Sequence, residues 1–347
     1  MSLVEIRLGR AARRHIEAHG LAARDIGCIP AAAGGPKGIA LLPFDRLFAR
    51  EWLPQIDRLE LIGASIGAWR MAALAQPDAL AALDRLQQVY VYEQNYPPRP
   101  SRTQVAATCR AVVRAVTDGA PLEPRNGIAL SVITALSRGP LLSGRRSAFA
   151  RAAVDNAIGR HRLAAHMRRV VFQSGDRSTL HVDDAFGYEA VAMDDANHED
   201  ALLASGSIPL VCNPVRNIAG APPGDYWDGG LIDYHLLWPY GPAPGLVLYP
   251  HFVPWVTPGW LDKSLRWRSR PRQHEWLSKV ILLAPSAAML ARLPRGKLPD
   301  RSDFYRFGQD HTARISSWQR TIAECERFAA AAFQWLQSPD LSLARPL

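Results

Sequence analysis

The residues best suited to chemistry lie in residues 59–69, where an apolar run leads into a G-x-S-x-G pattern centred on Ser65. This pattern is typical of a nucleophile elbow, in which a serine occupies a sharp turn between a strand and a helix. Gly63 and Gly67 allow the tight turn and leave the hydroxyl open. A helix that begins directly after Ser65 presents free N–H groups, which stabilise negative charge nearby. The pattern therefore predicts that Ser65 is a nucleophile.

A glycine-rich loop, Gly34-Gly35-Pro36-Lys37-Gly38, follows a strand of small residues. An acyl-transfer serine needs hydrogen-bond donors for the oxyanion that develops on the substrate. We expect the N–H groups of Gly34 and Gly35 to be those donors, because Pro36 has none. Lys37 would add positive charge beside them. The loop lacks the G-K-[ST] of a P-loop and the full G-x-G-x-x-G, which argues against a nucleotide site.

The expected base is Asp228, which stands before Gly229 and Gly230 at the end of a short strand. For a two-residue mechanism its carboxylate must lie about 2.6–3.2 Å from the Ser65 hydroxyl, or reach that distance with substrate. The alternative is a Ser-His-Asp triad of the α/β-hydrolase kind, in which a histidine follows the aspartate in the chain. The candidates for that histidine are His235, His251, His274 and His311.

A parallel sheet is expected to position these residues, because strands and helices alternate over residues 26–92. Residues 94–169 are expected to be mainly helical, with no strand before Val170. Further strands are expected at 170–173, 226–228, 246–250 and 279–283, with another starting at His181-Val182, and one long helix or a broken pair at 305–336. We predict an α/β protein with a three-layer α/β/α fold, a mostly parallel central sheet and a single domain over residues 1–347.

The composition suggests an ordinary globular protein of 347 residues with a net charge of +9. No apolar run approaches the roughly 20 residues that cross a bilayer, and no secretion signal opens the sequence, so a cytoplasmic protein is expected. No nucleic-acid-binding module accompanies the positive charge, so nucleic acid is not an expected partner. The four cysteines are far apart, which predicts buried thiols in a reducing compartment and not metal ligands.

Residues 251–276 interleave tryptophan with basic side chains. This combination suits an anionic membrane interface, where tryptophan enters the headgroup layer and arginine pairs with phosphate. The alternative is a proline-broken surface loop whose tryptophans pack inward. Peripheral contact with a membrane would involve Trp255, Trp260, Arg266, Trp267, Arg268, Arg270 and Arg272.

Together, the three motifs resemble those of the patatin-like phospholipases. In that family a G-G-x-[RK]-G loop forms the oxyanion hole, and the serine of G-x-S-x-G and the aspartate of D-G-[GA] form a catalytic dyad. The motifs occur here in the family's order, and residues 204–209 resemble its A-S-x-A-I-P segment. Ala32 and Ala33 stand where the family usually has an acidic residue and a third glycine. The resemblance covers about residues 25–235; it leaves 94–169 as a helical insertion or cap, and 236–347 as strands, the Trp/Arg-rich loop and a helix.

The resemblance implies a serine carboxylic-ester hydrolase, similar to phospholipase A or a lysophospholipase, that cleaves acyl esters of lipids without a metal or cofactor. Ser65 would form an acyl-enzyme, Asp228 would be the base, and Gly34 and Gly35 would hold the oxyanion. The motif residues expected to support them are Lys37, Gly38, Gly63, Gly67, Gly229 and Gly230. A patatin-like scaffold that binds lipid or a protein partner without turnover is a further alternative.

Overall fold

A computed structural model describes residues 2–139, 146–265, 267–268 and 274–347. Its strands are β1 (Val4–Leu8), β2 (Ile26–Ala31), β3 (Leu59–Ala64), β4 (Ile128–Ser137), β5 (Met167–Gly175), β6 (Glu189–Ala192), β7 (Val215–Arg216), β8 (Asp225–Asp228), β9 (Leu246–Pro250), β10 (Val280–Pro285) and β11 (Ala344–Pro346). They form an 11-stranded sheet in the order β11-β1-β10-β9-β2-β3-β4-β5-β6, with β8 beside β4 and β7 beside β8. The central strands β10, β9, β2, β3 and β4 are parallel to one another.

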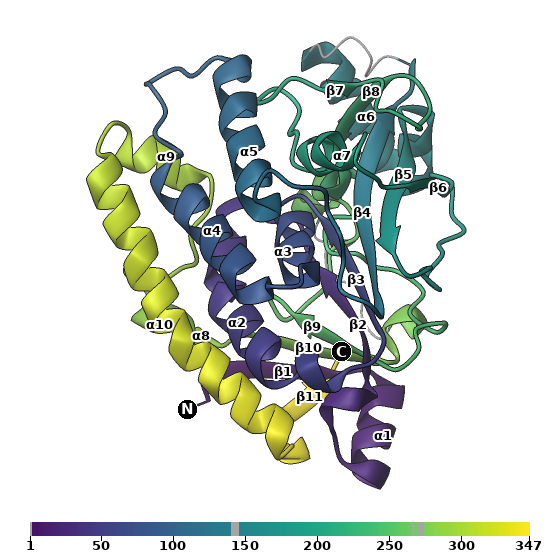
Figure 1. The fold of residues 1–347 in the computed structure, drawn as a ribbon, viewed down its shortest axis with the longest axis vertical. Coiled ribbons are helices and arrows are strands. Elements are labelled where there is room, and N and C mark those ends of the chain that lie inside the picture. Colours follow the sequence, from purple (N-terminus) through teal and green to yellow (C-terminus); the bar gives the residue numbers. More distant parts are fainter. Residues whose placement is uncertain (1, 140–145, 266, 269–273) are drawn as a thin grey trace.

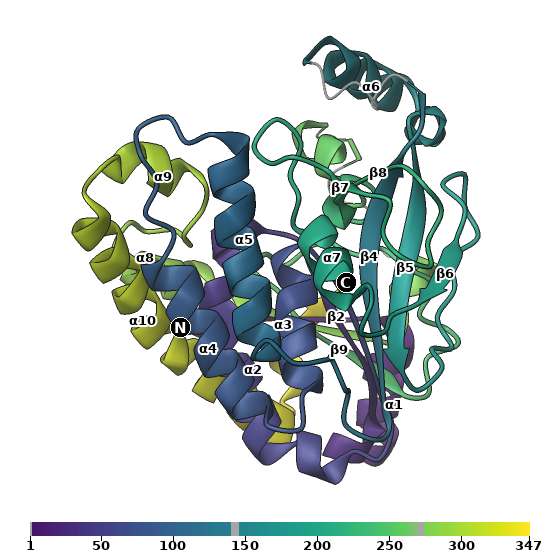
Figure 2. The same cartoon turned by 45° about the horizontal axis from the view of Figure 1, so that its top comes forward.

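The described helices are α1 (Arg10–His19), α2 (Leu42–Glu51), α3 (Ile66–Ala75), α4 (Ala79–Tyr92), α5 (Arg102–Thr117), α6 (Arg146–Ile158), α7 (His198–Ser205), α8 (Ala287–Arg292), α9 (Ser302–Phe307) and α10 (His311–Gln337). Figure 2 shows α2, α3, α4, α5 and α10 as one layer beside the sheet. Away from that layer, α1 packs against β10 (Figure 1). The predicted three-layer α/β/α fold with a mostly parallel sheet is confirmed.

The expectation of no strand before Val170 is wrong, because β4 spans ten residues at the centre of the sheet. Every residue of β4 is buried, between β3 on one side and β5 on the other. A strand buried on both faces reads as a continuous apolar run, and such a run has no two-residue period to distinguish it from a buried helix. Residues 94–169 therefore contribute part of the sheet as well as α5 and α6.

Smaller differences concern where elements begin and end. The described chain has no strand at His181-Val182, and β6 lies a few residues later. The first helix of the expected strand–helix alternation begins as a 3₁₀ turn, η2 (Gly35–Leu41), and continues as α2, with proline in its first turn. The C-terminal helix is a broken pair, because Gly308 has φ +53° between α9 and α10.

Two predictions about the environment of the protein are tested only in part. None of the described helices combines the length and apolar character that crossing a bilayer requires. The four cysteines are free, with Cys28, Cys212 and Cys325 buried and Cys109 half-buried. The compartment in which the protein works stays a prediction.

Candidate active site

The strand–turn–helix predicted around Ser65 is present. Strand β3 ends at Ala64 and α3 begins at Ile66, so Ser65 alone makes the turn. Its backbone has φ +58° and ψ −132°, a conformation that is strained for any residue except glycine. The Ser65 N–H donates to Ser205 Oγ at 2.9 Å, which helps to hold this conformation. Ser65 therefore lies at the N-terminus of a ten-residue helix, at the carboxyl end of a central strand.

Gly67 is required by a close approach between α3 and β2. A Cβ atom there would lie 2.0 Å from the Ala31 carbonyl oxygen. Gly63 and Gly38 face similar limits, since their Cβ atoms would lie 2.5 Å from the Ala68 nitrogen and the Ile66 side chain. These glycines let the helix, the strands and the glycine loop meet next to Ser65.

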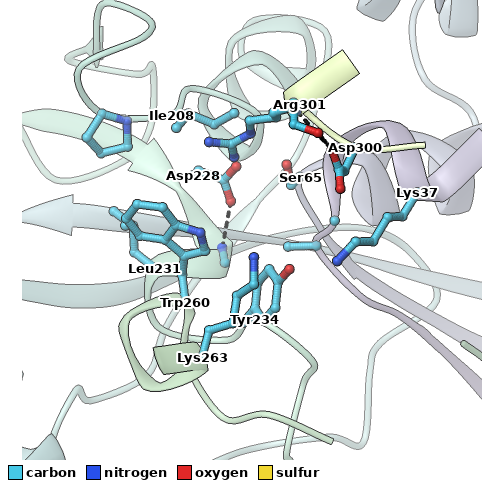
Figure 3. Close-up of a pocket in the computed structure, with 15 residues that line it drawn as sticks. Lys37, Ser65, Ile208, Asp228, Leu231, Tyr234, Trp260, Lys263, Asp300 and Arg301 are labelled. Atoms are coloured by element: carbon cyan, nitrogen blue, oxygen red, sulfur yellow. Dashed lines mark hydrogen bonds between the residues drawn. The ribbon is translucent and has the colours of Figure 1, made fainter. Parts of the chain in front are cut away.

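The register of the sheet brings Asp228 next to Ser65. Ala64, the last residue of β3, pairs with Ile133 of β4, and the next residue, Thr134, pairs with Asp228. Strand β8 therefore continues along β4 from the point where β3 ends. Gly229 permits this path, because a Cβ there would lie 2.2 Å from the Ile133 carbonyl oxygen. Figure 3 shows the Asp228 carboxylate beside Ser65.

The Asp228 carboxyl group is buried, and burial raises its pKa to about 6. The Ser65 hydroxyl, the Gly230 N–H and the Arg301 charge act in the opposite direction and favour the ionised form. The Gly230 N–H donates to Asp228 Oδ1 at 2.7 Å (Figure 3). The contact between the Ser65 hydroxyl and Asp228 lowers the pKa of Asp228 but does not have standard hydrogen-bond geometry in the described structure, so a dyad mechanism would require the two groups to close on substrate. Such closure is common, since catalytic hydrogen bonds often tighten only in the substrate complex.

The segment at the end of α7 connects Ser65 to Asp228. Ser205 Oγ, which accepts from the Ser65 N–H, donates to the Ile133 carbonyl oxygen at 2.7 Å. The carbonyl oxygen of Ser207 accepts a hydrogen bond from the Asp228 N–H at 2.9 Å. From the sequence, this segment was noticed only for its resemblance to the family pattern; its two serines hold both members of the candidate dyad in place.

The glycine loop supplies free donors at the same place. No described residue accepts a hydrogen bond from the N–H of Gly34 or Gly35. The loop is fixed one residue earlier, where the Ala33 N–H donates to the Tyr234 carbonyl oxygen at 2.9 Å. Gly35 has φ +55°, which favours glycine, and it begins η2. The N–H groups of Gly34 and Gly35 are therefore free to donate to an oxyanion.

A cavity of about 310 Å³ brings these groups together (Figure 3). The predicted residues that line it are Gly34, Lys37, Ser65, Asp228 and Gly230. Gly35, the second predicted oxyanion donor, does not line the cavity itself and lies next to Gly34 in the loop. The lining residues that sequence reasoning did not place here are Ile208, Pro209, Leu231, Tyr234, Trp260, Lys263, Asp300, Arg301 and Ser302, beside Ala33. Trp260 and Lys263 belong to the Trp/Arg-rich segment, whose pattern suggested contact with a membrane and not a place in this cavity. No pattern in the sequence singled out Asp300 or Arg301.

None of the four histidines proposed for a triad lines this cavity. His235 and His251 are buried side by side, with ring centroids 4.3 Å apart. Burial lowers the pKa of His251 to about 3, and that of His235 well below its usual value. His235 Nδ1 is occupied by the Thr257 N–H at 2.9 Å. The cavity geometry thus favours a dyad over a triad.

The Trp/Arg-rich segment differs from the surface expected of a membrane anchor. Trp255 and Trp260 are half-buried, whereas Trp267 is 75% exposed. Arg268 donates to the carbonyl oxygens of Asn156 and Ala157 and forms an ion pair with Asp262. Arg266, Arg270 and Arg272 lie outside the described residues. Contact of this segment with an anionic membrane stays a prediction.

The chain matches no model of a known protein family and no curated protein. Its function must therefore be argued from the site itself. Within the described ranges, no group of three or more histidine, cysteine, aspartate or glutamate side chains is arranged to hold a metal ion. The groups in the cavity that suit acyl transfer are the Ser65 hydroxyl, the Asp228 carboxylate, the glycine-loop N–H donors and cationic side chains.

Proposed function

We propose that this protein is a serine carboxylic-ester hydrolase that works through a dyad of Ser65 and Asp228. The observation that carries the proposal is the meeting, in one cavity, of a serine at a strained elbow, a buried carboxylate and a glycine loop with unoccupied N–H groups. These are the groups that acyl transfer requires. The arrangement is similar to the dyad of patatin-like phospholipases.

In the first half of the reaction, the Asp228 carboxylate removes the proton from Ser65 Oγ as the oxygen attacks the ester carbonyl carbon. The negative charge that develops on the carbonyl oxygen is stabilised by the N–H groups of Gly34 and Gly35. The intermediate then expels the alcohol, which takes the proton from Asp228, and leaves an acyl group on Ser65. Water attacks this ester, gives one proton to Asp228 and releases the acid as that proton returns to Ser65.

Acyl esters of lipids are the substrate class that we propose, on the resemblance to the patatin-like family. The cavity supports it with an apolar wall formed by Ile208, Leu231 and Trp260. Apolar walls with a few polar groups are typical of sites that bind acyl chains and other small molecules. An enzyme similar to a phospholipase A or a lysophospholipase would place the chain against this wall.

A fluorophosphonate probe tests the proposal directly, because it forms a stable adduct only with an activated serine. We expect the folded wild-type protein to be labelled at Ser65, located by mass spectrometry of the peptide. Ser65→Ala is the negative control, and heat-denatured protein controls for non-specific labelling. Absence of an adduct on folded wild-type protein would show that the serine is not activated and would favour a binding scaffold without turnover.

The pH dependence of kcat/KM follows from the raised pKa of Asp228, about 6. Only the ionised carboxylate can accept the Ser65 proton, so activity should be full above that pH and fall about tenfold per unit below it. Initial rates with an uncharged ester between about pH 4 and about pH 8 would measure this profile. A rate that stays constant down to about pH 4 contradicts Asp228 as the base.

A further inference from the structure

Three cationic side chains line the cavity and have no ion-pair partner among the described residues. Lys37 belongs to η2, Lys263 to the 3₁₀ turn η7 (Trp260–Ser264), and Arg301 precedes α9. Figure 3 shows the charged ends of all three near Ser65 and Asp228. The Lys37 ammonium lies 4.9 Å from the centre of the Phe252 ring, and that of Lys263 lies 5.8 Å from the Tyr234 ring.

The negative charges in the cavity do not balance these cations. Asp300 is already paired, since it accepts hydrogen bonds from Lys297 Nζ at 2.5 Å and from Ser302 N at 2.8 Å. Burial would raise the pKa of Asp300, but the hydrogen bonds from Lys297 and Ser302 lower it to about 2. The remaining anion is Asp228, the proposed base. The cavity therefore holds an excess of positive charge when empty.

Bringing like charges together in a partly buried place raises the free energy of the protein, and an anionic ligand offsets this cost. This cost is reflected at Lys37, where burial and the nearby charge of Lys263 lower the pKa to about 8, although the charge of Asp300 acts to raise it. The planar guanidinium of Arg301 is suited to two parallel hydrogen bonds with a carboxylate or a phosphate. Arg301 lies against the glycine loop, because a Cβ at Gly35 would be 3.8 Å from its Nε.

We propose that Lys263 and Arg301, with Lys37, form a subsite for an anionic group of the substrate, a phosphate or a carboxylate. This inference rests on the proposed ester hydrolysis and adds to it a substrate class: an acyl ester whose negative charge lies close to the scissile bond. Ser65 and the three cations line the same cavity of about 310 Å³, so a substrate that contacts both carries its charge near the ester. Lys263 and Arg301 are specificity residues that lie outside the part of the chain resembling patatin-like enzymes.

Matched esters test this subsite. We would compare kcat/KM for monobutyrylglycerol, its phosphate monoester, and the butyryl ester of glyceric acid, which differ in charge but present the same acyl group. The wild-type protein should prefer at least one anionic ester about tenfold or more, as expected for charge-assisted hydrogen bonds. The anionic ester with the higher kcat/KM shows whether the subsite prefers a phosphate or a carboxylate. Equal values of kcat/KM for all three would overturn the proposal.

Substitutions of the cations show which of two roles they have. They either bind the anionic group of the substrate or stabilise the oxyanion that forms on any ester, charged or neutral. Lys263→Gln and Arg301→Gln should each remove most of the anionic preference, mainly through KM, while Arg301→Lys should retain part of it. Arg306→Gln, at an exposed position on α9 outside the cavity, is the matched control and should retain all of it. An equal fall in kcat for charged and neutral esters would assign the cations to the oxyanion and overturn the subsite.

A binding measurement separates this inference from the proposed function. Ser65→Ala protein should bind inorganic phosphate in a calorimeter, and binding should weaken about tenfold or more when Lys263→Gln and Arg301→Gln are added. A thermal melt of each variant confirms that it is folded. If the cation substitutions abolish phosphate binding and the wild-type protein hydrolyses no ester, the hydrolase is contradicted but the subsite is supported. Ester hydrolysis by the wild-type protein, with no phosphate binding to Ser65→Ala, would support the hydrolase and contradict the subsite.

Discussion

Replacing Asp228 with asparagine should lower kcat for ester hydrolysis by a factor of about 10²–10⁴, the usual contribution of a general base. The amide has the same shape and keeps an oxygen to accept the Gly230 N–H, which donates at 2.7 Å in the wild-type protein. It cannot accept the proton of Ser65, so attack on the ester loses its base. Initial rates with monobutyrylglycerol, measured on folded protein, would give the size of the loss.

Two controls make this result specific to the dyad. Asp225→Asn lies on the same strand, and its carboxylate pairs with the exposed Arg216, so activity should remain close to that of the wild type. His235→Gln and His251→Gln should also retain most of their activity, because neither histidine lines the cavity. A histidine variant that loses as much activity as Asp228→Asn would contradict the dyad and favour a triad.

The parts of the fold that were predicted from the sequence are those that depend on neighbouring residues. The strand, the turn at Ser65 and α3 follow one another within residues 59–75, so glycine spacing and apolar character were enough to identify them. Strand β4 was missed because its ten buried residues have no alternating pattern. This omission affects the site, because β3 and β8 both pair with β4, and that pairing brings Asp228 next to Ser65.

The parts of the site that were not predicted depend on contacts between distant segments. Asp228 was found because it belongs to a short motif, but its position next to Ser65 is set by the pairing of β8 with β4. Lys263 and Arg301 reach the cavity only because the C-terminal third of the chain folds over the glycine loop. Lys263 stands in the Trp/Arg-rich segment, for which membrane contact and a packed surface loop were the two interpretations, and Arg301 stands in no pattern of residue types. The sequence therefore placed neither residue at the site.

Gly67→Ala should destabilise the protein by about 3 kcal/mol or more, at the upper end of the cost of overpacking a core. Alanine has the higher helix propensity, by about 1 kcal/mol, so a gain would be expected at an ordinary helical position. Here the new Cβ would lie 2.0 Å from the Ala31 carbonyl oxygen and 2.8 Å from that of Ala32. Both are backbone atoms of the segment that leads into the glycine loop, so neither can move aside as a flexible side chain would.

Relief of this overlap requires α3 to move away from β2, and such a movement separates Ser65 from the N–H groups of Gly34 and Gly35. Any folded Gly67→Ala protein should therefore show a lower kcat as well as a lower urea midpoint, because small displacements of a nucleophile reduce the rate strongly. Gly241→Ala is the matched control, since its Cβ would meet nothing within 4 Å, and its urea midpoint should be unchanged. A wild-type midpoint for Gly67→Ala would show that the elbow is not as tightly packed against β2 as the structure indicates.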